Sequence, residues 1–223
     1  MPLDLPAAPA TYLVSRGATT PETTSASEEF TRLLALVGAA AGARIDLVQI
    51  REKLLRPRVL YELASCCAEV TRGTRTRLLV NDRADIARAA GADGVHLTTR
   101  SLEASVVRRA FGADFLIGVS AHTLAEARAA RDGGADFAVF GPVFDTPSKR
   151  ARGAPAGLAA LREVAHALSP FPLFAIGGVT RENAPRVISA GARGVAAIRL
   201  FDDADSLRDM VEEIRGLPFH AVE

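Results

Sequence analysis

A loop rich in hydroxyl and basic side chains, residues 140–157, offers the clearest chemistry in this sequence. It follows the apolar run Asp136–Phe140, and a helical pattern starts after it at Leu158. Its polar members are Thr146, Ser148, Lys149, Arg150 and Arg152, with Gly153 beside them. Hydroxyls, fixed positive charges and N–H groups made accessible by glycine are the donors that a phosphate or diphosphate needs. The loop therefore predicts an anion site, with a solvated basic loop as the structural alternative.

A strand end with alternating polar side chains offers a second set of anion-binding groups. Gln49, Arg51 and Lys53 lie two residues apart at and beyond the end of the apolar run Ile45–Ile50. Side chains two apart on a strand point to the same side, so these three would face one region. A surface ladder of ion pairs is the structural alternative, but the end of a buried strand favours a binding role.

Three other apolar runs contain or precede single polar residues that could do chemistry. Asp82 could cap the next helix, or it could bind Mg²⁺, which takes one or two carboxylates together with phosphate oxygens. His96 could be a hydrogen-bonded core residue or a binding residue near a strand end. Ser120 could donate to an anion or cap the helix that follows.

Composition limits the kinds of partner. The chain has 223 residues and a formal net charge of +1, so a general basic field for nucleic acid or an acidic membrane is excluded and anion binding must be local. No apolar run approaches the roughly 20 residues of a membrane span. Cys66 and Cys67 are adjacent in a helical pattern, which favours unpaired thiols and a cytoplasmic protein. The oligomeric state stays open, with a homo-oligomer as one option.

One local pattern recurs along the chain and predicts the fold. A helical stretch ends at Gly42, Gly91, Gly134 and Gly191, and each time a short apolar run follows. Glycine after a helix favours a left-handed cap, and a continuous apolar run is typical of a parallel strand buried on both faces. The repeating unit is therefore a helix, a glycine turn and a parallel strand.

The remaining apolar runs complete an alternating series of strands and helices. Strands are expected near 12–15, 45–50, 76–80, 94–97, 115–119, 137–140, 173–176 and 195–198. Helices are expected near 25–40, 56–71, 83–90, 102–111, 124–132, 158–168, 182–190 and 204–214. Eight such units in one domain predict a single (β/α)8 TIM barrel over residues 10–223, with an open doubly wound sheet as the alternative. Residues 1–9 lack a signal-peptide pattern and are expected to form a loose arm.

A barrel would bring the polar strand ends together at one mouth, because active sites of TIM barrels lie at the carboxyl ends of the strands. The same rule predicts a second anion site at the ends of the last two strands. Gly177 and Gly178 follow the seventh strand, and Arg199 follows the eighth. Phosphate sites of TIM barrels are often found there.

Seven motifs, taken in order, resemble the thiamin phosphate synthases and their thiazole tautomerase relatives. They are VQIREK (48–53), NDR (81–83), GADGVHL (91–97), IGVSAH (117–122), FGPVFDTPSK (140–149), AIGGV (175–179) and GVAAI (194–198). The likeness covers nearly the whole chain after Pro9. It implies a transferase that joins hydroxymethylpyrimidine diphosphate to thiazole phosphate and releases pyrophosphate.

The resemblance also implies a role for each matching residue. Arg51, Lys53, Asn81, Ser120 and Lys149 match positions that hold the pyrophosphate, and we expect Arg51, Lys53 and Lys149 to be catalytic. Tyr12, Gln49 and His96 match positions around the pyrimidine, whereas Thr146, Ser148 and Gly178 match positions that hold the thiazole phosphate. Asp82 matches a ligand of Mg²⁺, the expected cofactor.

Three positions depart from the patterns of the family. Ser101 stands where the synthases carry a second metal-binding Asp, and Arg199 stands where a small Ser is usual. The tautomerases carry a catalytic His where this chain has Pro142. The sequence therefore favours the synthase, with a tautomerase-like isomerase and a non-catalytic barrel that binds thiazole phosphate as alternatives.

Overall fold

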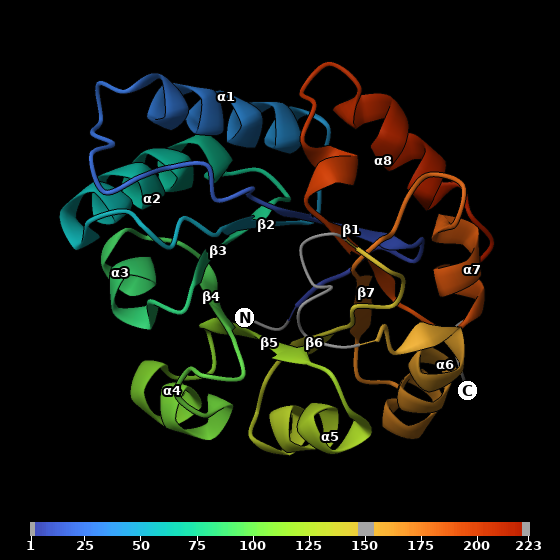
Figure 1. Ribbon diagram of the computed structural model, residues 1–223. Helices are drawn as coiled ribbons and strands as arrows, with labels where there is room; N and C mark the ends of the chain where they lie inside the picture. The colour runs from blue at the N-terminus through green and yellow to red at the C-terminus, as the bar shows by residue number, and fades with distance from the viewer. Residues whose placement is uncertain (1–2, 147–153, 220–223) are drawn as a thin grey trace.

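The chain folds into a closed barrel of eight parallel strands surrounded by eight α-helices (Figure 1). The computed structural model describes residues 3–146 and 154–219. The strands pair in chain order, and β1 closes the barrel by pairing with β8. This confirms the predicted TIM barrel and excludes the open doubly wound sheet, because an open sheet would leave its edge strands unpaired.

The elements lie close to their predicted places. The strands are β1 (Ala10–Val14), β2 (Leu47–Ile50), β3 (Arg77–Asn81), β4 (Gly94–Leu97), β5 (Leu116–Ala121), β6 (Phe137–Phe140), β7 (Leu173–Ile176) and β8 (Gly194–Ala197). The helices are α1 (Glu28–Gly42), α2 (Pro57–Thr71), α3 (Ala84–Ala89), α4 (Ala104–Phe111), α5 (Leu124–Asp132), α6 (Gly157–Leu168), α7 (Ala184–Ser189) and α8 (Leu207–Arg215), and the short 3-10 helix η2 spans Arg199–Phe201. Among the described helices, none has the length and apolar character that a membrane crossing requires.

The outer layer of the core lies between the strands and the helices. On α1 the buried residues are Phe30, Leu33, Val37 and Ala40, at the three- and four-residue spacing that places them along one helical face. The strands supply the other side of this layer with residues such as Val48 and Val80, both buried completely. Burial of this apolar stripe fixes how each helix lies against the barrel.

The barrel interior is filled by large aromatic rings below the site. The Tyr12 ring packs edge-on against Phe137 and Phe174, at centroid distances of 5.7 and 5.8 Å. Gly118 on β5 makes room for this cluster, because a Cβ there would overlap the Phe137 ring and would lie 2.8 Å from Nδ1 of His96. The interior is therefore a packed plug that supports residues at the mouth above it.

Most of the predicted glycine turns are confirmed. Gly91, Gly134 and Gly191 have φ values of +74°, +83° and +94°, the left-handed conformation that glycine adopts without steric cost. The first repeat differs, because α1 continues through Gly42 and the left-handed residue is Arg44, with φ of +62°. Gly42 is therefore the last residue of the helix and not the residue of the turn.

Replacing Arg44 by glycine should stabilise the protein slightly. The left-handed conformation costs a residue with a Cβ roughly 1–2 kcal/mol, and the greater freedom of glycine in the unfolded chain cancels part of that gain. We therefore expect Arg44→Gly to raise the free energy of unfolding by up to about 1 kcal/mol. Urea denaturation of the variant beside Arg32→Gly, at an exposed α1 position, checks this, since the control should lose stability. Equal losses in both variants would contradict the expectation.

The N-terminal arm contacts the end of the barrel opposite the site. Leu3 and Leu5 pack against the interior cluster that contains Tyr12 and Phe174. Arg193, just before β8, donates hydrogen bonds to the carbonyl oxygens of Ala8 and Pro6. These contacts attach residues 3–9 to the amino ends of the strands.

Candidate active site

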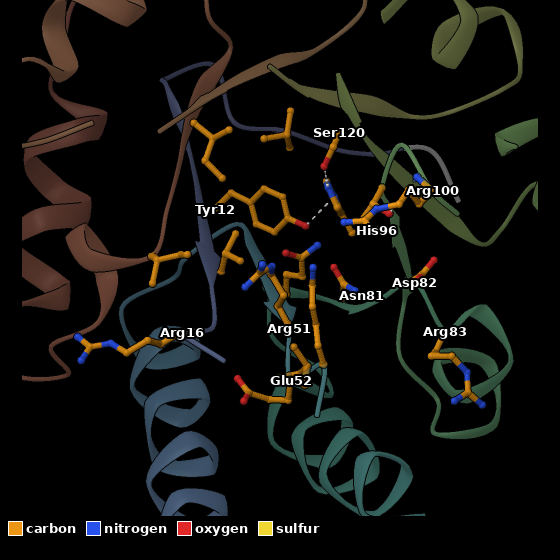
Figure 2. A pocket seen from close by; sticks show the side chains of 18 of the residues that line it. Tyr12, Arg16, Arg51, Glu52, Asn81, Asp82, Arg83, His96, Arg100 and Ser120 are labelled. Carbon is orange, nitrogen blue, oxygen red and sulfur yellow. Dashed lines mark hydrogen bonds between the residues drawn. The ribbon is translucent and has the colours of Figure 1, made fainter. Parts of the chain in front are cut away.

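A cavity of about 720 Å³ opens at the carboxyl ends of the strands. It gathers eight of the predicted site residues, contributed by strands β1 to β5 and the segments that follow them: Tyr12, Gln49, Arg51, Lys53, Asn81, Asp82, His96 and Ser120. In Figure 2, Arg51 lies between the Tyr12 ring and Glu52. Parallel strands place their carboxyl ends at one mouth, so residues up to 108 positions apart meet here.

A row of hydrogen bonds crosses the cavity floor from Tyr12 through His96 to Ser120 (Figure 2). The Tyr12 hydroxyl lies 3.1 Å from Nδ1 of His96, and Nε2 of His96 lies 3.0 Å from Oγ of Ser120. Burial, with a smaller effect from the positive charge of Arg51, lowers the pKa of His96 to about 3. Burial also raises the pKa of Tyr12 well above its usual value. All three residues are therefore neutral hydrogen-bonding groups at pH 7.

Two buried amide groups in the cavity have an atom without a partner among the described residues. Nε2 of Gln49 is buried and donates no hydrogen bond to a described residue, and Oδ1 of Asn81 is buried and accepts none from one. Gln49 is only 2% exposed. Leaving such a group unpaired costs about 1–3 kcal/mol, which a polar ligand in the cavity would recover. The pair offers one donor and one acceptor to such a ligand.

Positive charge dominates the lining. The cationic lining residues are Arg16, Arg51, Lys53, Arg83 and Arg100, and the carboxylates are Glu52 and Asp82. Two of these cations are engaged by carboxylates outside the cavity lining, because Arg16 pairs with Asp202 and Arg83 pairs with Asp85. Figure 2 shows the Arg83 side chain directed away from Arg51 and His96. The excess charge suits an anionic ligand with several acceptor oxygens.

Asp82 is the carboxylate in this lining that could bind a metal ion. The other one, Glu52, is buried and accepts hydrogen bonds from Ser15, Gly17 and Thr19. Oγ of Ser101 accepts a 2.7 Å hydrogen bond from the Thr98 backbone, so it forms a local turn. Among the described residues, no three His, Cys, Asp or Glu side chains form a metal-binding group. A single carboxylate fits Mg²⁺ when phosphate oxygens and waters complete the octahedron.

The loop that follows β6 packs against the glycines after β7. Val143 donates to the Ile176 carbonyl at 2.9 Å, and Phe144 donates to the Gly177 carbonyl at 3.0 Å. Gly178 has φ of +66°, and a Cβ there would lie 2.6 Å from the Asp145 carbonyl oxygen. Glycine is therefore required here for close packing of two loops, and its role toward thiazole phosphate stays a prediction.

The remaining predicted residues lie outside the cavity lining or outside the described chain. Thr146 is described and partly buried at the end of the β6 loop, whereas Ser148 and Lys149 fall outside the described residues. Arg199 does not line this cavity, although we expected it to join the others. It is exposed at the start of η2, and its neighbour Ile198 lines the cavity instead, because the chain turns into a 3-10 helix directly after β8.

Several lining residues were not singled out from the sequence. Arg16 follows β1, and His122 follows β5, where its Nδ1 donates a hydrogen bond to the Gly141 carbonyl. Glu52 points away from Arg51 in Figure 2, as strand alternation would predict for the residue between Arg51 and Lys53. That alternation was the available signal for Glu52, whereas the pairing of Arg16 with Asp202 depends on barrel closure.

Comparison with known proteins agrees with this arrangement. A family model described as thiamine monophosphate synthase matches residues 21–201. Thiamine-phosphate synthases from Methanoculleus marisnigri and Moorella thermoacetica are 46% and 40% identical over 165 and 190 residues, covering 74% and 82% of this chain and 77% and 90% of theirs. A solved structure, thiamine phosphate pyrophosphorylase from Pyrococcus furiosus, superposes with a TM-score of 0.75 at 28% identity, covering 93% of this chain and 97% of its own. The chain therefore belongs to the thiamine monophosphate synthase family.

Proposed function

We propose that this chain is a thiamine-phosphate synthase that joins a pyrimidine diphosphate to a thiazole phosphate. The observation that carries the proposal is the cavity itself, whose lining combines Arg51 and Lys53 with the amide atoms of Gln49 and Asn81 that have no partner in the described part of the chain. One part of this lining suits a diphosphate, and the other suits a heterocycle with its own donors and acceptors. The family membership supports the same pair of substrates.

The chemistry requires stabilisation of a leaving diphosphate. The carbon–oxygen bond between the pyrimidine methylene and the diphosphate breaks, and the electron pair leaves with the diphosphate. The thiazole nitrogen then supplies the pair for the new carbon–nitrogen bond. Arg51 and Lys53 would stabilise the charge that develops on the diphosphate oxygens, and Lys149 is predicted to join them. The protein otherwise holds the two rings in line for attack.

The neutral row on the cavity floor suits the pyrimidine. His96 stays uncharged at neutral pH, because burial and Arg51 lower the pKa to about 3. It adds no positive charge that would oppose a cationic pyrimidine intermediate. Gln49 and Asn81 would complete recognition of the ring through the donor and acceptor that have no partner among the described residues.

Mg²⁺, if bound, would be held by Asp82 and the diphosphate oxygens, and it would neutralise part of the leaving-group charge. Asp82→Asn tests this role without disturbing the backbone, since Asn tolerates the left-handed φ of +64° found there. We expect the Mg²⁺ affinity in the presence of pyrophosphate to fall by about tenfold to a hundredfold. Calorimetric titration checks this, with exposed Asp85→Asn as the matched control. Unchanged affinity in Asp82→Asn would remove Asp82 from the metal site.

Complementation of a synthase-deficient cell that requires thiamin is the direct test of function. The chain should restore growth without thiamin, and the purified protein should bind both substrates and release pyrophosphate when they are combined. Binding of thiazole phosphate alone would instead favour the non-catalytic barrel. Turnover between thiazole isomers would favour the tautomerase-like enzyme, although the position that the resemblance assigns to its catalytic His is Pro142.

The wider setting follows from the same proposal. We place the enzyme in the cytoplasm, with two small phosphorylated substrates as its partners and neither nucleic acid nor membrane. Sedimentation of the purified chain would decide between a monomer and a homo-oligomer.

A further inference from the structure

Glu52 is a buried carboxylate at the cavity, and its hydrogen bonds come from the loop that follows β1. It is 4% exposed. Oε1 accepts from Oγ of Ser15 at 2.6 Å and from the backbone of Gly17 at 3.0 Å. Oε2 accepts from the backbone and the hydroxyl of Thr19, at 3.1 and 2.7 Å. One side chain therefore collects four donors from residues 15–19.

These bonds use the whole acceptor capacity of the carboxylate. Two carboxylate oxygens offer about four lone-pair sites, and four donors occupy them here. A carboxylate in this condition has no oxygen lone pair left for a metal ion or for a substrate proton. Any effect of Glu52 on the site must therefore be transmitted by the loop that it binds.

The loop in turn is built against Arg51. The backbone N–H of Arg51 donates to Oγ of Ser15 at 2.7 Å, and the backbone of Ser15 donates to the Gln49 carbonyl at 2.9 Å. Gly17 lies so close that a Cβ there would be 3.3 Å from the Arg51 carbonyl oxygen and 3.7 Å from a terminal nitrogen of its guanidinium. The loop therefore bonds to the backbone of Arg51 through Ser15, and Gly17 keeps the space beside the Arg51 guanidinium free of a side chain.

We propose that Glu52 is a positioning residue that holds the 15–19 loop in place and, through this loop, fixes the Arg51 guanidinium for the diphosphate. The proposal rests on the function proposed above and adds a residue that never touches the substrate. Displacement of a charged group by about 1 Å can cost as much as a hundredfold in rate, so a mobile loop beside Arg51 would weaken the site strongly.

The chain supplies a matched control at the other end of the same strand. Asp46, just before β2, is also a buried carboxylate bound to a β1 residue, accepting from the backbone and hydroxyl of Thr11 at 2.8 and 3.0 Å. It accepts a further bond from Arg215 at 2.9 Å. Asp46→Asn therefore breaks a comparable buried network far from the cavity.

The test measures the affinity for inorganic pyrophosphate with Mg²⁺ by calorimetry, at a temperature where circular dichroism shows each variant folded. Glu52→Gln keeps one acceptor oxygen but presents an amide N–H₂ to donors, and we expect affinity to fall about tenfold to a hundredfold. Thr19→Val removes a single hydroxyl bond and should cost about threefold. Asp46→Asn should lower Tm yet keep affinity within about twofold of the wild type, because distant sites act independently.

Arg51→Gln separates failure of this inference from failure of the proposed function. If Arg51→Gln weakens pyrophosphate binding while Glu52→Gln binds as Asp46→Asn does, the positioning role is wrong and the function stands. If Arg51→Gln binds pyrophosphate normally, the proposed diphosphate site is wrong and the role of Glu52 falls with it. Should Glu52→Gln fail to fold, Thr19→Val decides, and wild-type affinity in that variant would overturn the inference.

Discussion

In an Arg51→Gln variant we expect kcat/KM for the pyrimidine diphosphate to fall by about 10²–10³, the usual loss when one preorganised stabiliser of developing charge is removed. Arg51 lines the same cavity as Gln49, whose Nε2 has no partner within residues 3–146 and 154–219, and its backbone N–H donates to Ser15 in the 15–19 loop. Glutamine keeps hydrogen-bond donors but removes the charge that balances the leaving diphosphate. Most of the loss should therefore appear in kcat, because that charge develops in the transition state.

Arg83→Gln is the control for this experiment. Arg83 also borders the cavity, but its guanidinium makes bonds of 2.9 and 2.6 Å to the Asp85 carboxylate. Figure 2 shows it directed away from the centre of the site. Its removal should change kcat/KM only about twofold to fivefold, the scale of a screened surface charge. Equal losses in the two variants would mean that net charge, rather than the placement of Arg51, supports the reaction.

A second readout reports directly on the field of Arg51. The positive charge of Arg51 contributes, after burial, to the lowered pKa of His96. Arg51→Gln should therefore raise the pKa of His96 part of the way toward its ordinary value, as followed by NMR of the ring. An unchanged pKa would place the guanidinium farther from His96 than the structure does.

Acid should unfold this protein partly through His96. Burial, with a smaller contribution from Arg51, lowers the pKa of His96 from 6.5 to about 3. Between those two values His96 is protonated in the unfolded chain but not in the folded protein. The free energy of unfolding therefore falls as the pH falls. The stabilisation is complete above about pH 6.5, and the full loss by pH 3 is on the order of 5 kcal/mol.

Urea denaturation at a series of pH values measures this effect. His96→Gln cannot take up that proton, so its stability should decline less steeply than the wild type between pH 6.5 and 4, whatever its stability at neutral pH. In His166→Gln, at an exposed position on α6, the free energy of unfolding should depend on pH as it does in the wild type. Parallel curves for the wild type and His96→Gln would show that folding does not lower the pKa of His96.

Sequence periodicity was sufficient for the features that depend on near neighbours. Gly91 and Gly134 adopt the left-handed turn that the repeat indicates, because only local backbone sterics decide that conformation. Gln49, Arg51 and Lys53 line one cavity because alternation along a strand is also local. The first turn shows the limit of this rule, since α1 ends with Gly42 as a helical residue and the left-handed conformation falls on Arg44.

By itself the sequence determined the (β/α)8 class and the mouth at which the polar strand ends meet, because these follow from periods of two and of about 3.6 residues. Together with the motif resemblance it also named eight of the residues that line the cavity. Only the tertiary structure decided which groups face one another across that mouth. Tyr12 on β1 hydrogen-bonds to His96 on β4, and Glu52 accepts hydrogen bonds from the loop after β1. Arg199 lies in η2 and does not line the cavity. Such partners are set by closure of β1 on β8 and by the packing of loops, which bring together residues that no local pattern connects.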